Sequence, residues 1–374
     1  MKILFTGGAT GGHFYPIIAI AESIYDITKE KKILPPKLYF MSPNQYNPRA
    51  LFDNDIEYIK IPAGKVRRYF SLLNFTDIFK TIYGVLIAIW HMYRIYPDIV
   101  FGKGGFGSFP ALFAARLFRI PVIIHESDSS PGKVNAWAAK FAQKIAISYP
   151  EAVKFFDEKK VAFTGNPIRK EIILPLTNGA KEFLNLEDNT PVIVILGGSQ
   201  GAQNINDVII DGIGEFVKKY QIIHQTGKKN FELSTETAKI VLKDNPYAYR
   251  YHPFDYLNDL AMRMAAGSSS LIISRAGSTI FEIAAWGKPS IIIPLSKAVS
   301  HDQENNAFAY AHSGSCSVIE EMNLNAHILM SEIDRIIENK SIRNKMIEGT
   351  KQFSHTNAAQ KIAEVILETA LSHE

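Results

Sequence analysis

Residues 2–13 read Lys-Ile-Leu-Phe-Thr-Gly-Gly-Ala-Thr-Gly-Gly-His, an apolar run followed by two pairs of glycines and a histidine. The run predicts a short buried strand over residues 2–6, and apolar residues at helical spacing follow over residues 17–25. Glycines between a strand and a helix let the backbone approach a ligand, and the free amides that start the helix favour an anion. The stretch therefore predicts a strand, a ligand-binding loop and a helix; a turn without a ligand is the alternative.

The same alternation continues through the first half of the chain. Helices are predicted over residues 111–117 and 134–142, and strands over residues 38–41, 56–61, 98–101, 121–125, 144–148 and 161–164. Strands that alternate with helices are typical of parallel βαβ units. The first half is therefore expected to form one parallel sheet.

The pattern restarts at residue 191. An apolar strand over residues 191–196 leads into a glycine loop over residues 197–201 and a helix over residues 204–219. Further strands are predicted over residues 222–226, 271–274, 290–294 and 316–319, and a last helix over residues 357–371. We therefore predict two Rossmann-like domains, with a junction near residues 165–175.

Composition excludes several classes of protein. A chain of 374 residues suits two domains, and 47% hydrophobic residues supply a core for each. Cys316 is the single cysteine, which excludes a disulfide framework and a cysteine-rich metal site. A net charge of +4 does not by itself indicate nucleic-acid binding. The apolar run at the N-terminus is too short for a signal peptide, so we expect a cytoplasmic protein.

The most apolar stretch of the sequence, residues 82–90, is too short to span a bilayer. Lys80 precedes it, and His91 and Arg94 follow it. The stretch predicts a buried helix, with a helix lying at a membrane interface as the alternative.

Two further glycine loops each precede a helix, at residues 104–110 and 197–202. The amides of the second loop and the hydroxyl of Ser199 could hold a phosphate or pyrophosphate, whereas the first could also be only a tight turn. Neither loop continues as a P-loop, and the loop at residues 7–12 does not match the dinucleotide fingerprint. Nucleotide hydrolysis and a plain NAD site are therefore disfavoured.

A carboxylate near the start of a helix follows the strand predicted over residues 271–274. Glu282 lies in the first or second turn, where it could accept two ribose hydroxyls or only complement the helix dipole. Two other patterns are interpreted as structural. Residues 53–55 read Asp-Asn-Asp, as in some metal-dependent glycosyltransferases, but they lie in a polar turn. Tyr25 and Lys29 match a dehydrogenase pair, but they lie on the solvated face of a helix.

Seven motifs in order resemble the MurG family of bacterial glycosyltransferases. They lie at residues 6–16, 102–108, 125–135, 164–169, 197–202, 274–279 and 303–307, and so extend over essentially the whole chain. The resemblance implies the GT-B fold, in which two Rossmann-like α/β domains with parallel sheets face an interdomain cleft. Residues 1–168, with a C-terminal helix of about residues 357–374 packed back on them, would form the acceptor and membrane-side domain. Residues 169–356 would form the UDP-GlcNAc domain.

The resemblance also implies a reaction. The family transfers GlcNAc from UDP-GlcNAc to the C4 hydroxyl of the MurNAc sugar of lipid I, with inversion, and so makes lipid II for peptidoglycan synthesis, cell shape and cell division. It implies no cofactor and no tightly bound metal. His13 is the predicted general base, because a histidine has a suitable pKa and its loop would face the cleft.

The resemblance assigns further residues to the two substrates. Gly104, Gly105 and Ser108 would help to hold the acceptor diphosphate. The residues predicted to contact UDP-GlcNAc are Thr10, Gly11, Gly12, Asp128, Arg169, Ser199, Ser278, Thr279, Glu282 and Gln303, and Asp302 is a further candidate. Position 128 holds Asp where many family members are expected to have Asn.

A polyprenyl-linked acceptor places such an enzyme at the cytoplasmic face of the membrane, as a peripheral protein. Basic and aromatic residues at 65–70, with the helix at residues 82–90 and Arg94, suit anionic headgroups. The alternative function is that of another GT-B enzyme, one that glycosylates a different lipid such as diacylglycerol. A nucleotide-sugar-binding protein without catalysis is disfavoured by the joint presence of His13, Ser199, Arg169, Glu282 and Gln303, and an NAD-linked oxidoreductase or epimerase is disfavoured by the glycine loops.

Overall fold

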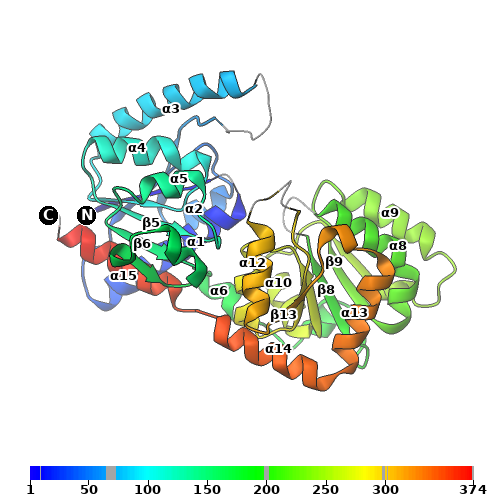
Figure 1. Ribbon diagram of the computed structural model, residues 1–374. Coiled ribbons are helices and arrows are strands. Elements are labelled where there is room, and N and C mark those ends of the chain that lie inside the picture. Colours follow the sequence, from blue (N-terminus) through cyan, green and yellow to red (C-terminus); the bar gives the residue numbers. More distant parts are fainter. Residues whose placement is uncertain (9, 65–72, 198–201, 297–299, 301, 373–374) are drawn as a thin grey trace. The chain divides into compact units, whose positions relative to one another are not determined.

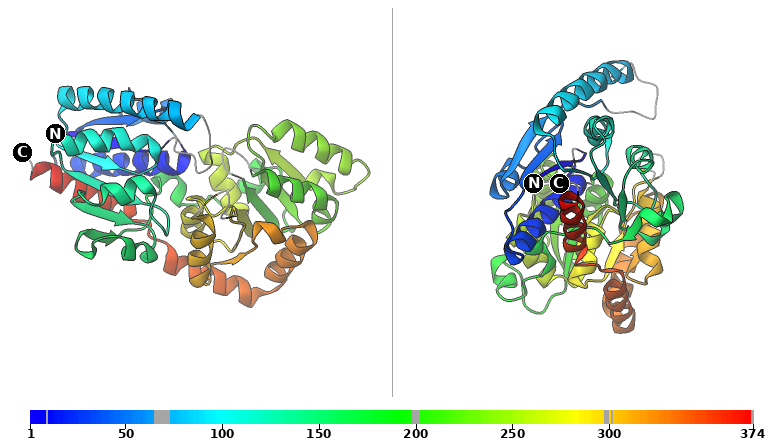
Figure 2. Two further views of the ribbon diagram at one scale, coloured as in Figure 1. Left: turned by 45° about the horizontal axis from the view of Figure 1, so that its top comes forward. Right: turned by 90° about the vertical axis from the view of Figure 1, so that its left-hand side faces the viewer.

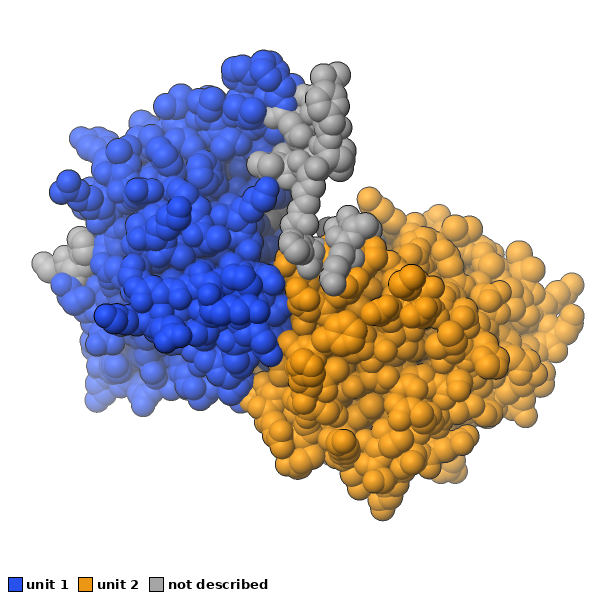
Figure 3. All heavy atoms as spheres, viewed as in Figure 1, with its two compact units in different colours: residues 1–169, 355–374 blue, residues 170–354 orange. Residues whose placement is uncertain are grey.

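The computed structural model describes residues 1–8, 10–64, 73–197, 202–296, 300 and 302–372. The chain divides into two compact units (Figure 3). Unit 1 comprises residues 1–169 and 355–374, and unit 2 comprises residues 170–354. In the described parts of both units, every paired strand is parallel to its neighbours, as the alternating pattern predicts.

Seven strands form the sheet of unit 1 among its described residues, in the order β3-β2-β1-β4-β5-β6-β7. The strands are β1 (Lys2–Thr6), β2 (Lys37–Ser42), β3 (Ile56–Lys60), β4 (Ile99–Gly102), β5 (Val122–Glu126), β6 (Lys144–Ile147) and β7 (Val161–Phe163). The helices are α1 (Gly11–Glu30), α2 (Pro48–Asp53), α3 (Leu73–Ile95), α4 (Phe109–Leu117), α5 (Lys133–Ala138) and α15 (Ala358–Leu371), and three short 3₁₀ helices span Phe106–Ser108, Pro150–Phe155 and Glu158–Lys160.

Alternate residues of β1 enter different cores, because successive side chains of a strand point to opposite faces. Ile3 and Phe5 belong to the core formed with α1 and α15, and Leu4 belongs to the core formed with α3 and α4. Figures 1 and 2 show α3 and α4 on one side of this sheet and α15 on the other. Both faces are covered, as parallel sheets require.

Helix α3 is only partly buried, which corrects the prediction of a buried helix over residues 82–90. Ala88 and Met92 are fully buried against the sheet, but Leu86 is 60% exposed and Trp90 is 52% exposed. The described residues of unit 1 therefore leave much of the apolar face of α3 uncovered. No helix within the described residues is long and apolar enough to cross a membrane.

Six strands form the sheet of unit 2 among its described residues, in the order β10-β9-β8-β11-β12-β13. They are β8 (Val192–Leu196), β9 (Gln221–Gln225), β10 (Tyr251–Phe254), β11 (Leu271–Ser274), β12 (Ser290–Ile292) and β13 (Cys316–Val318). The helices are α6 (Lys170–Ile173), α7 (Ala180–Phe183), α8 (Gln203–Lys219), α9 (Phe231–Val241), α10 (Asp259–Ser268), α11 (Thr279–Trp286), α12 (Gln303–His312), α13 (Ala326–Glu338) and α14 (Lys340–Phe353), with 3₁₀ helices over Ala248–Arg250 and Glu321–Asn323.

Candidate active site

Each sheet has one topological switch point, where the strand order reverses direction along the sheet. In unit 1 the chain runs from β1 outward to β2 and β3, and then returns to β4 on the other side of β1. In unit 2 the equivalent neighbours are β8 and β11. Open α/β sheets bind ligands at the carboxyl ends of the strands that flank such a point. The loops after β1, β4, β8 and β11 are therefore the candidate site loops, and they contain most of the predicted residues.

The first loop leads directly into helix α1. Thr10 is the N-cap residue, and Gly11 and Gly12 are the first two residues of the helix. The Thr10 side chain makes no capping bond to the backbone, and its carbonyl accepts the amides of His13 and Phe14 at 3.1 and 3.0 Å. The start of a helix of 20 residues with no side-chain cap has free amides for an anion.

The ring of His13 lies against two glycines from different loops of unit 1. A Cβ atom at Gly8 would lie 3.0 Å from Nδ1, and a Cβ atom at Gly105 would lie 3.4 Å from Nε2. The Thr10 hydroxyl oxygen is 2.8 Å from Nδ1. Nδ1 is therefore occupied within the loop, and Nε2 points toward the loop after β4.

The pKa of His13 is lowered to about 3, first by burial and then by the positive charge of Lys103. Part of the side chain reaches solvent, but protein atoms surround the ring closely. The imidazole is therefore neutral at physiological pH, with a lone pair available to accept a proton. The lowered pKa makes the His13 imidazole a weaker base than an ordinary histidine.

The loop after β4 contains the three predicted acceptor residues. Gly104 and Gly105 have φ angles of +83° and +78°, which favour glycine. Ser108 is fully buried, and its hydroxyl donates to the carbonyl of Gly105 at 2.8 Å. The serine side chain therefore shapes this loop, and the glycine backbone is the part left to meet a ligand.

The loop after β5 is organised by Glu126. Its Oε1 accepts the amide of Asp128 at 3.0 Å, and its Oε2 accepts the amide of Gly132 at 3.1 Å and Nδ2 of Asn135 at 2.9 Å. Burial and the neighbouring Asp128 raise the pKa of Glu126 to about 7, against the opposing effect of these bonds and of Lys103. Asp128, a predicted donor contact, is half-buried beside this carboxylate.

Arg169 is the last residue of the first segment of unit 1. Its guanidinium carbon lies 4.0 Å from the centre of the ring of Tyr15. Tyr15 is the second residue after His13 on helix α1. A guanidinium stacked on a ring is favourable and leaves its edges able to bind oxygen atoms. Arg169 is therefore held beside the start of α1.

The loop after β8 and its Ser199 lie outside the described residues, as do residues 65–70, to which the membrane hypothesis also refers. The loop after β11 is described. Ser278 is the N-cap residue of α11 and makes no side-chain capping bond, Thr279 is the first residue of the helix, and Glu282 lies in its first turn. All three are partly exposed, so their side chains can reach a ligand.

Gln303 is the first residue of α12 and follows the N-cap residue Asp302. Its side-chain carbonyl accepts the amide of Leu295 at 3.0 Å, which ties the start of α12 to the end of β12. The amide nitrogen of Gln303 remains as a donor for a sugar hydroxyl or carbonyl.

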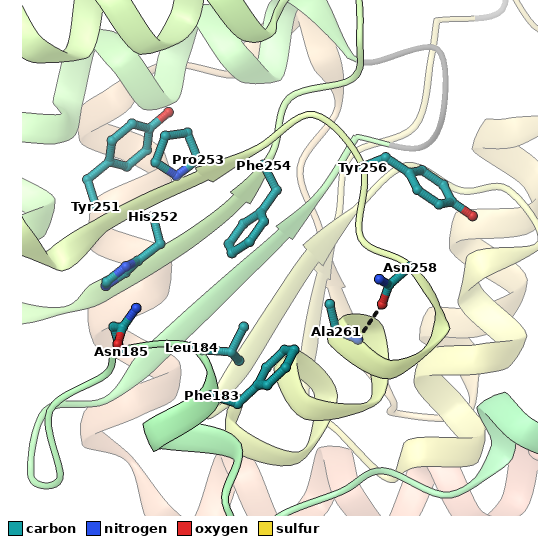
Figure 4. Close-up of a pocket in the computed structure, with 10 residues that line it drawn as sticks. All are labelled: Phe183, Leu184, Asn185, Tyr251, His252, Pro253, Phe254, Tyr256, Asn258 and Ala261. Carbon is teal, nitrogen blue, oxygen red and sulfur yellow. Dashed lines mark hydrogen bonds between the residues drawn. The ribbon is translucent and has the colours of Figure 1, made fainter.

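Unit 2 also has a pocket of about 470 Å³ at its edge strand β10 (Figure 4). His252 and Phe254 point into it from the strand, while Tyr251 and Pro253 lie on the other face. The remaining lining residues are Phe183, Leu184, Asn185, Tyr256, Asn258 and Ala261. None of the predicted donor residues lines this pocket. Within the described residues, no cluster of three or more His, Cys, Asp or Glu side chains could hold a metal ion.

Comparison with known proteins identifies the family. Sequence models of the glycosyltransferase family 28 N-terminal and C-terminal domains match residues 3–147 and 192–362. The chain is 37% identical over 368 residues to a protein of Clostridium novyi (strain NT), and 98% of each chain is covered. That protein is named UDP-N-acetylglucosamine–N-acetylmuramyl-(pentapeptide) pyrophosphoryl-undecaprenol N-acetylglucosamine transferase. A protein of the same name from Treponema denticola is 35% identical over 384 residues, with 97% of this chain and 95% of the relative covered.

A solved structure of Acinetobacter baumannii MurG has a TM-score of 0.72 at 24% identity, and covers 98% of this chain and 100% of that one. The chain belongs to the MurG family. It is a glycosyltransferase, and the predicted GT-B fold of two Rossmann-like domains is confirmed. The UDP-GlcNAc 2-epimerase of Neisseria meningitidis, solved with UDP-GlcNAc, shares this fold with a TM-score of 0.67 at 18% identity, covering 98% of this chain and all of the epimerase.

Sequence reasoning gave no role to three buried residues of this MurG family member: Lys103, Glu126 and Asn135. Lys103 follows β4 and Glu126 ends β5, so the parallel pairing of these strands brings them together. The sequence does place Lys103 between an apolar strand and a glycine loop, but a lysine at such a position is usually exposed, so its burial could not be predicted.

Proposed function

We propose that the chain transfers GlcNAc from UDP-GlcNAc to the C4 hydroxyl of the MurNAc sugar of lipid I, forming lipid II for peptidoglycan synthesis. The observation that carries this proposal is the identity of 35–37%, over nearly the whole chain, with transferases named for this donor and acceptor. A single displacement inverts the anomeric centre and gives a β-linkage.

His13 is the proposed general base. Its Nε2 accepts the proton of the C4 hydroxyl while the hydroxyl oxygen bonds to the anomeric carbon and the bond from that carbon to UDP breaks. A pKa of about 3 makes the unliganded imidazole a weak base. Negative charge on the acceptor diphosphate, held at the Gly104–Gly105 backbone, favours the imidazolium and so strengthens the base when substrate is bound.

Unit 2 is the proposed donor unit. UDP leaves with negative charge, and the amides at the start of α8, α11 and α12, with Ser199, supply fixed dipoles for it. Glu282 accepts the ribose hydroxyls, Gln303 donates to the transferred GlcNAc, and Ser278 and Thr279 contact the nucleotide. The proposed mechanism uses no cofactor and no tightly bound metal.

Unit 1 is the proposed acceptor unit, and it also contributes to the donor. Thr10, Gly11 and Gly12 offer the free amides of α1, and Asp128 offers a carboxylate to a sugar hydroxyl. Arg169 offers a guanidinium, held by its stacking on Tyr15, to a phosphate or to uracil. The proposal is therefore that the polar groups nearest His13 bind sugar and phosphate oxygens.

The membrane is the proposed partner of helix α3, with the chain bound peripherally at the cytoplasmic face. Eight apolar or aromatic side chains of α3 are each more than half exposed, and their spacing of one, three or four residues places them on one face of the helix. They are Phe75, Ile78, Phe79, Ile82, Tyr83, Leu86, Trp90 and Tyr93. The Arg94 guanidinium carbon lies 4.7 Å from the centre of the Trp90 ring, so a cation adjoins the apolar face.

The test is a product assay with UDP-GlcNAc and three acceptor conditions: a lipid I analogue, diacylglycerol, and no acceptor. The proposal expects UDP and a disaccharide only with the lipid I analogue. A glycosylated diacylglycerol would establish the alternative acceptor instead. UDP release that is the same without any acceptor would contradict the transferase proposal.

A further inference from the structure

Lys103 is a buried cation in unit 1. It directly follows β4, and its amide donates to the carbonyl of Thr6 at 2.8 Å, next to the loop that carries His13. Its side chain is 1% exposed, and within the described residues its Nζ has no hydrogen-bond partner. An ammonium group taken out of water without a hydrogen bond is costly, so other charges must offset its burial.

Two carboxylates supply that charge. Strands β4 and β5 are parallel neighbours, so their carboxyl ends, and with them Lys103 and the loop of Glu126 and Asp128, lie at the same edge of the sheet. Burial lowers the pKa of Lys103 to about 8, and the charges of Glu126 and Asp128 oppose that shift. The cation and the two carboxylates therefore depend on one another.

Glu126 also holds the loop of residues 127–132 in place, so the charge state of Glu126 affects the conformation of that loop. It accepts hydrogen bonds from the amides of Asp128 and Gly132 and from Asn135. These bonds and the ammonium favour the ionised carboxylate, whereas burial and Asp128 favour the protonated one. A protonated Glu126 would hold this loop less firmly, because hydrogen bonds to a charged acceptor are stronger.

The same ammonium acts on two histidines. Burial is the main cause of the lowered pKa of His13 and of the buried His125, and the charge of Lys103 lowers both further. Nε2 of His125 lies 3.1 Å from the carbonyl oxygen of Gly165 and 3.2 Å from Oγ of Ser148. The charged groups that act on Lys103 or respond to it are thus His13, His125, Glu126 and Asp128.

We propose that Lys103 is a positioning residue: its buried ammonium, at the end of β4 beside the end of β5, is the shared countercharge of Glu126 and Asp128 at the sheet edge whose loops also carry His13. It acts through these residues and touches no substrate. Its effect on turnover rests on the proposed function, but its effect on His13 does not.

The first experiment measures transfer against pH. Lys103→Met removes the charge at similar length, and we expect kcat/KM for the acceptor to fall at least tenfold at pH 7. The acid limb of the profile should move up by about one pH unit, because Glu126 then takes up its proton at higher pH. Lys103→Met combined with Asp128→Asn leaves the net charge of the site as in the wild type and should recover activity to within about threefold of Asp128→Asn alone. Lys144→Met, at an exposed position on β6, is the charge control and should leave the profile unchanged.

The second experiment needs no turnover. Nitrogen-15 NMR of the histidine rings of the full chain, with His13 assigned from a His13→Gln variant, follows the protonation of His13. Its titration midpoint should rise by about one pH unit in Lys103→Met and also in the double variant, since both lack the ammonium. If the single variant does not fold, as judged by circular dichroism, the double variant carries the test. An unchanged midpoint in a folded variant would overturn the proposal, and so would a double variant that falls below Asp128→Asn by the same factor as Lys103→Met falls below the wild type.

Discussion

The hydroxyl oxygen of Thr10 lies 2.8 Å from Nδ1 of His13, three residues along the same helix. When Nδ1 carries its proton, the threonine hydroxyl oxygen accepts a hydrogen bond from Nδ1–H, and Nε2 then carries the lone pair. Nε2 is the nitrogen that faces the loop after β4. In the tautomer that the proposed base role requires, Thr10 therefore accepts the hydrogen bond of Nδ1–H and Nε2 is the basic nitrogen.

Thr10→Val tests this relationship. Valine keeps the shape of the side chain but cannot accept a hydrogen bond from Nδ1–H, so we expect kcat to fall about tenfold, the scale of one lost hydrogen bond. Thr10→Ser retains the hydroxyl and should keep kcat within about threefold of the wild type. Steady-state kinetics with a lipid I analogue measure both, and equal losses in the two variants would contradict the tautomer role.

His13→Ala tests the base itself. Loss of a general base lowers turnover by about 10²–10⁴-fold. UDP-GlcNAc binding, measured by calorimetry, should stay nearly intact, because the proposed donor contacts in this loop are the backbone amides of residues 10–12, which the substitution does not remove. If donor binding disappears together with turnover, His13 is a binding residue and the base role is wrong.

Gly105→Ala tests the space around the ring. The φ angle of Gly105 is +78°, and an added Cβ would lie 2.9 Å from Cα of Gly8 and 3.4 Å from Nε2 of His13. We expect a loss of about 1–3 kcal/mol in unfolding free energy and a loss of turnover, because the two loops must separate. Gly214→Ala, within α8, meets only Asn245 at 4.0 Å and should be neutral or slightly stabilising. Denaturant titration compares the two, and equal stability would argue against a tight contact.

The exposed apolar face of helix α3 should be needed for binding to membranes. Ile82→Glu combined with Leu86→Glu places two charges on its exposed apolar face, so we expect co-sedimentation with anionic vesicles to fall at least tenfold. Ile240→Glu, on the 76% exposed Ile240 of α9, changes a similar surface residue in unit 2 and should bind as the wild type does. Neutralising Arg67, Arg68 and Arg94 should weaken binding in a salt-dependent way. Unchanged sedimentation in both sets of variants would contradict the proposal.

The burial of His224 should make the free energy of unfolding depend on pH. His224 lies between Tyr251 and Asn206, and burial lowers its pKa from 6.5 to about 3. The unfolded chain binds this proton below pH 6.5 but the folded chain does so only near pH 3, so stability falls as pH decreases through that interval. In His224→Gln the slope of unfolding free energy against pH should decrease by about 1.4 kcal/mol per pH unit between these values. Denaturant titrations at several pH values measure it, and parallel slopes would contradict the assignment.

Most strands could be predicted because they are short apolar runs that end in glycine or a polar residue. β10 (Tyr251–Phe254) was missed because it is a half-buried edge strand that contains a proline, so neither a continuous apolar run nor a clear alternation marks it. The exposure of α3 was expected only in the alternative of a helix at a membrane interface, because the apolar run by itself predicted a buried helix. Apolar periodicity shows that a helix has an apolar face, but not whether protein or another partner covers it.

The sequence could predict only those parts of the candidate site that lie close together along the chain. The glycine loops and His13 form a local pattern of strand, turn and helix that can be read along the chain. The group formed by Lys103, Glu126 and Asn135 is not local, because it depends on which strands are neighbours and on how deeply each side chain is buried. The low pKa of His13 follows from the same burial, so it could not be read from the sequence.

Helix α15 affects the order in which the chain can fold during synthesis. Its residues Ile362, Ala363, Ile366, Leu367 and Ala370 belong to the same core as α1 and β1, yet they lie within the last 20 residues of the chain, after all of unit 2. While the ribosome still holds these residues, that face of the first sheet lacks part of its cover, although every residue of the second unit has already been made. Unit 1 is therefore completed only after unit 2 has been made, and the nascent chain exposes an apolar surface until the residues of α15 have left the ribosome.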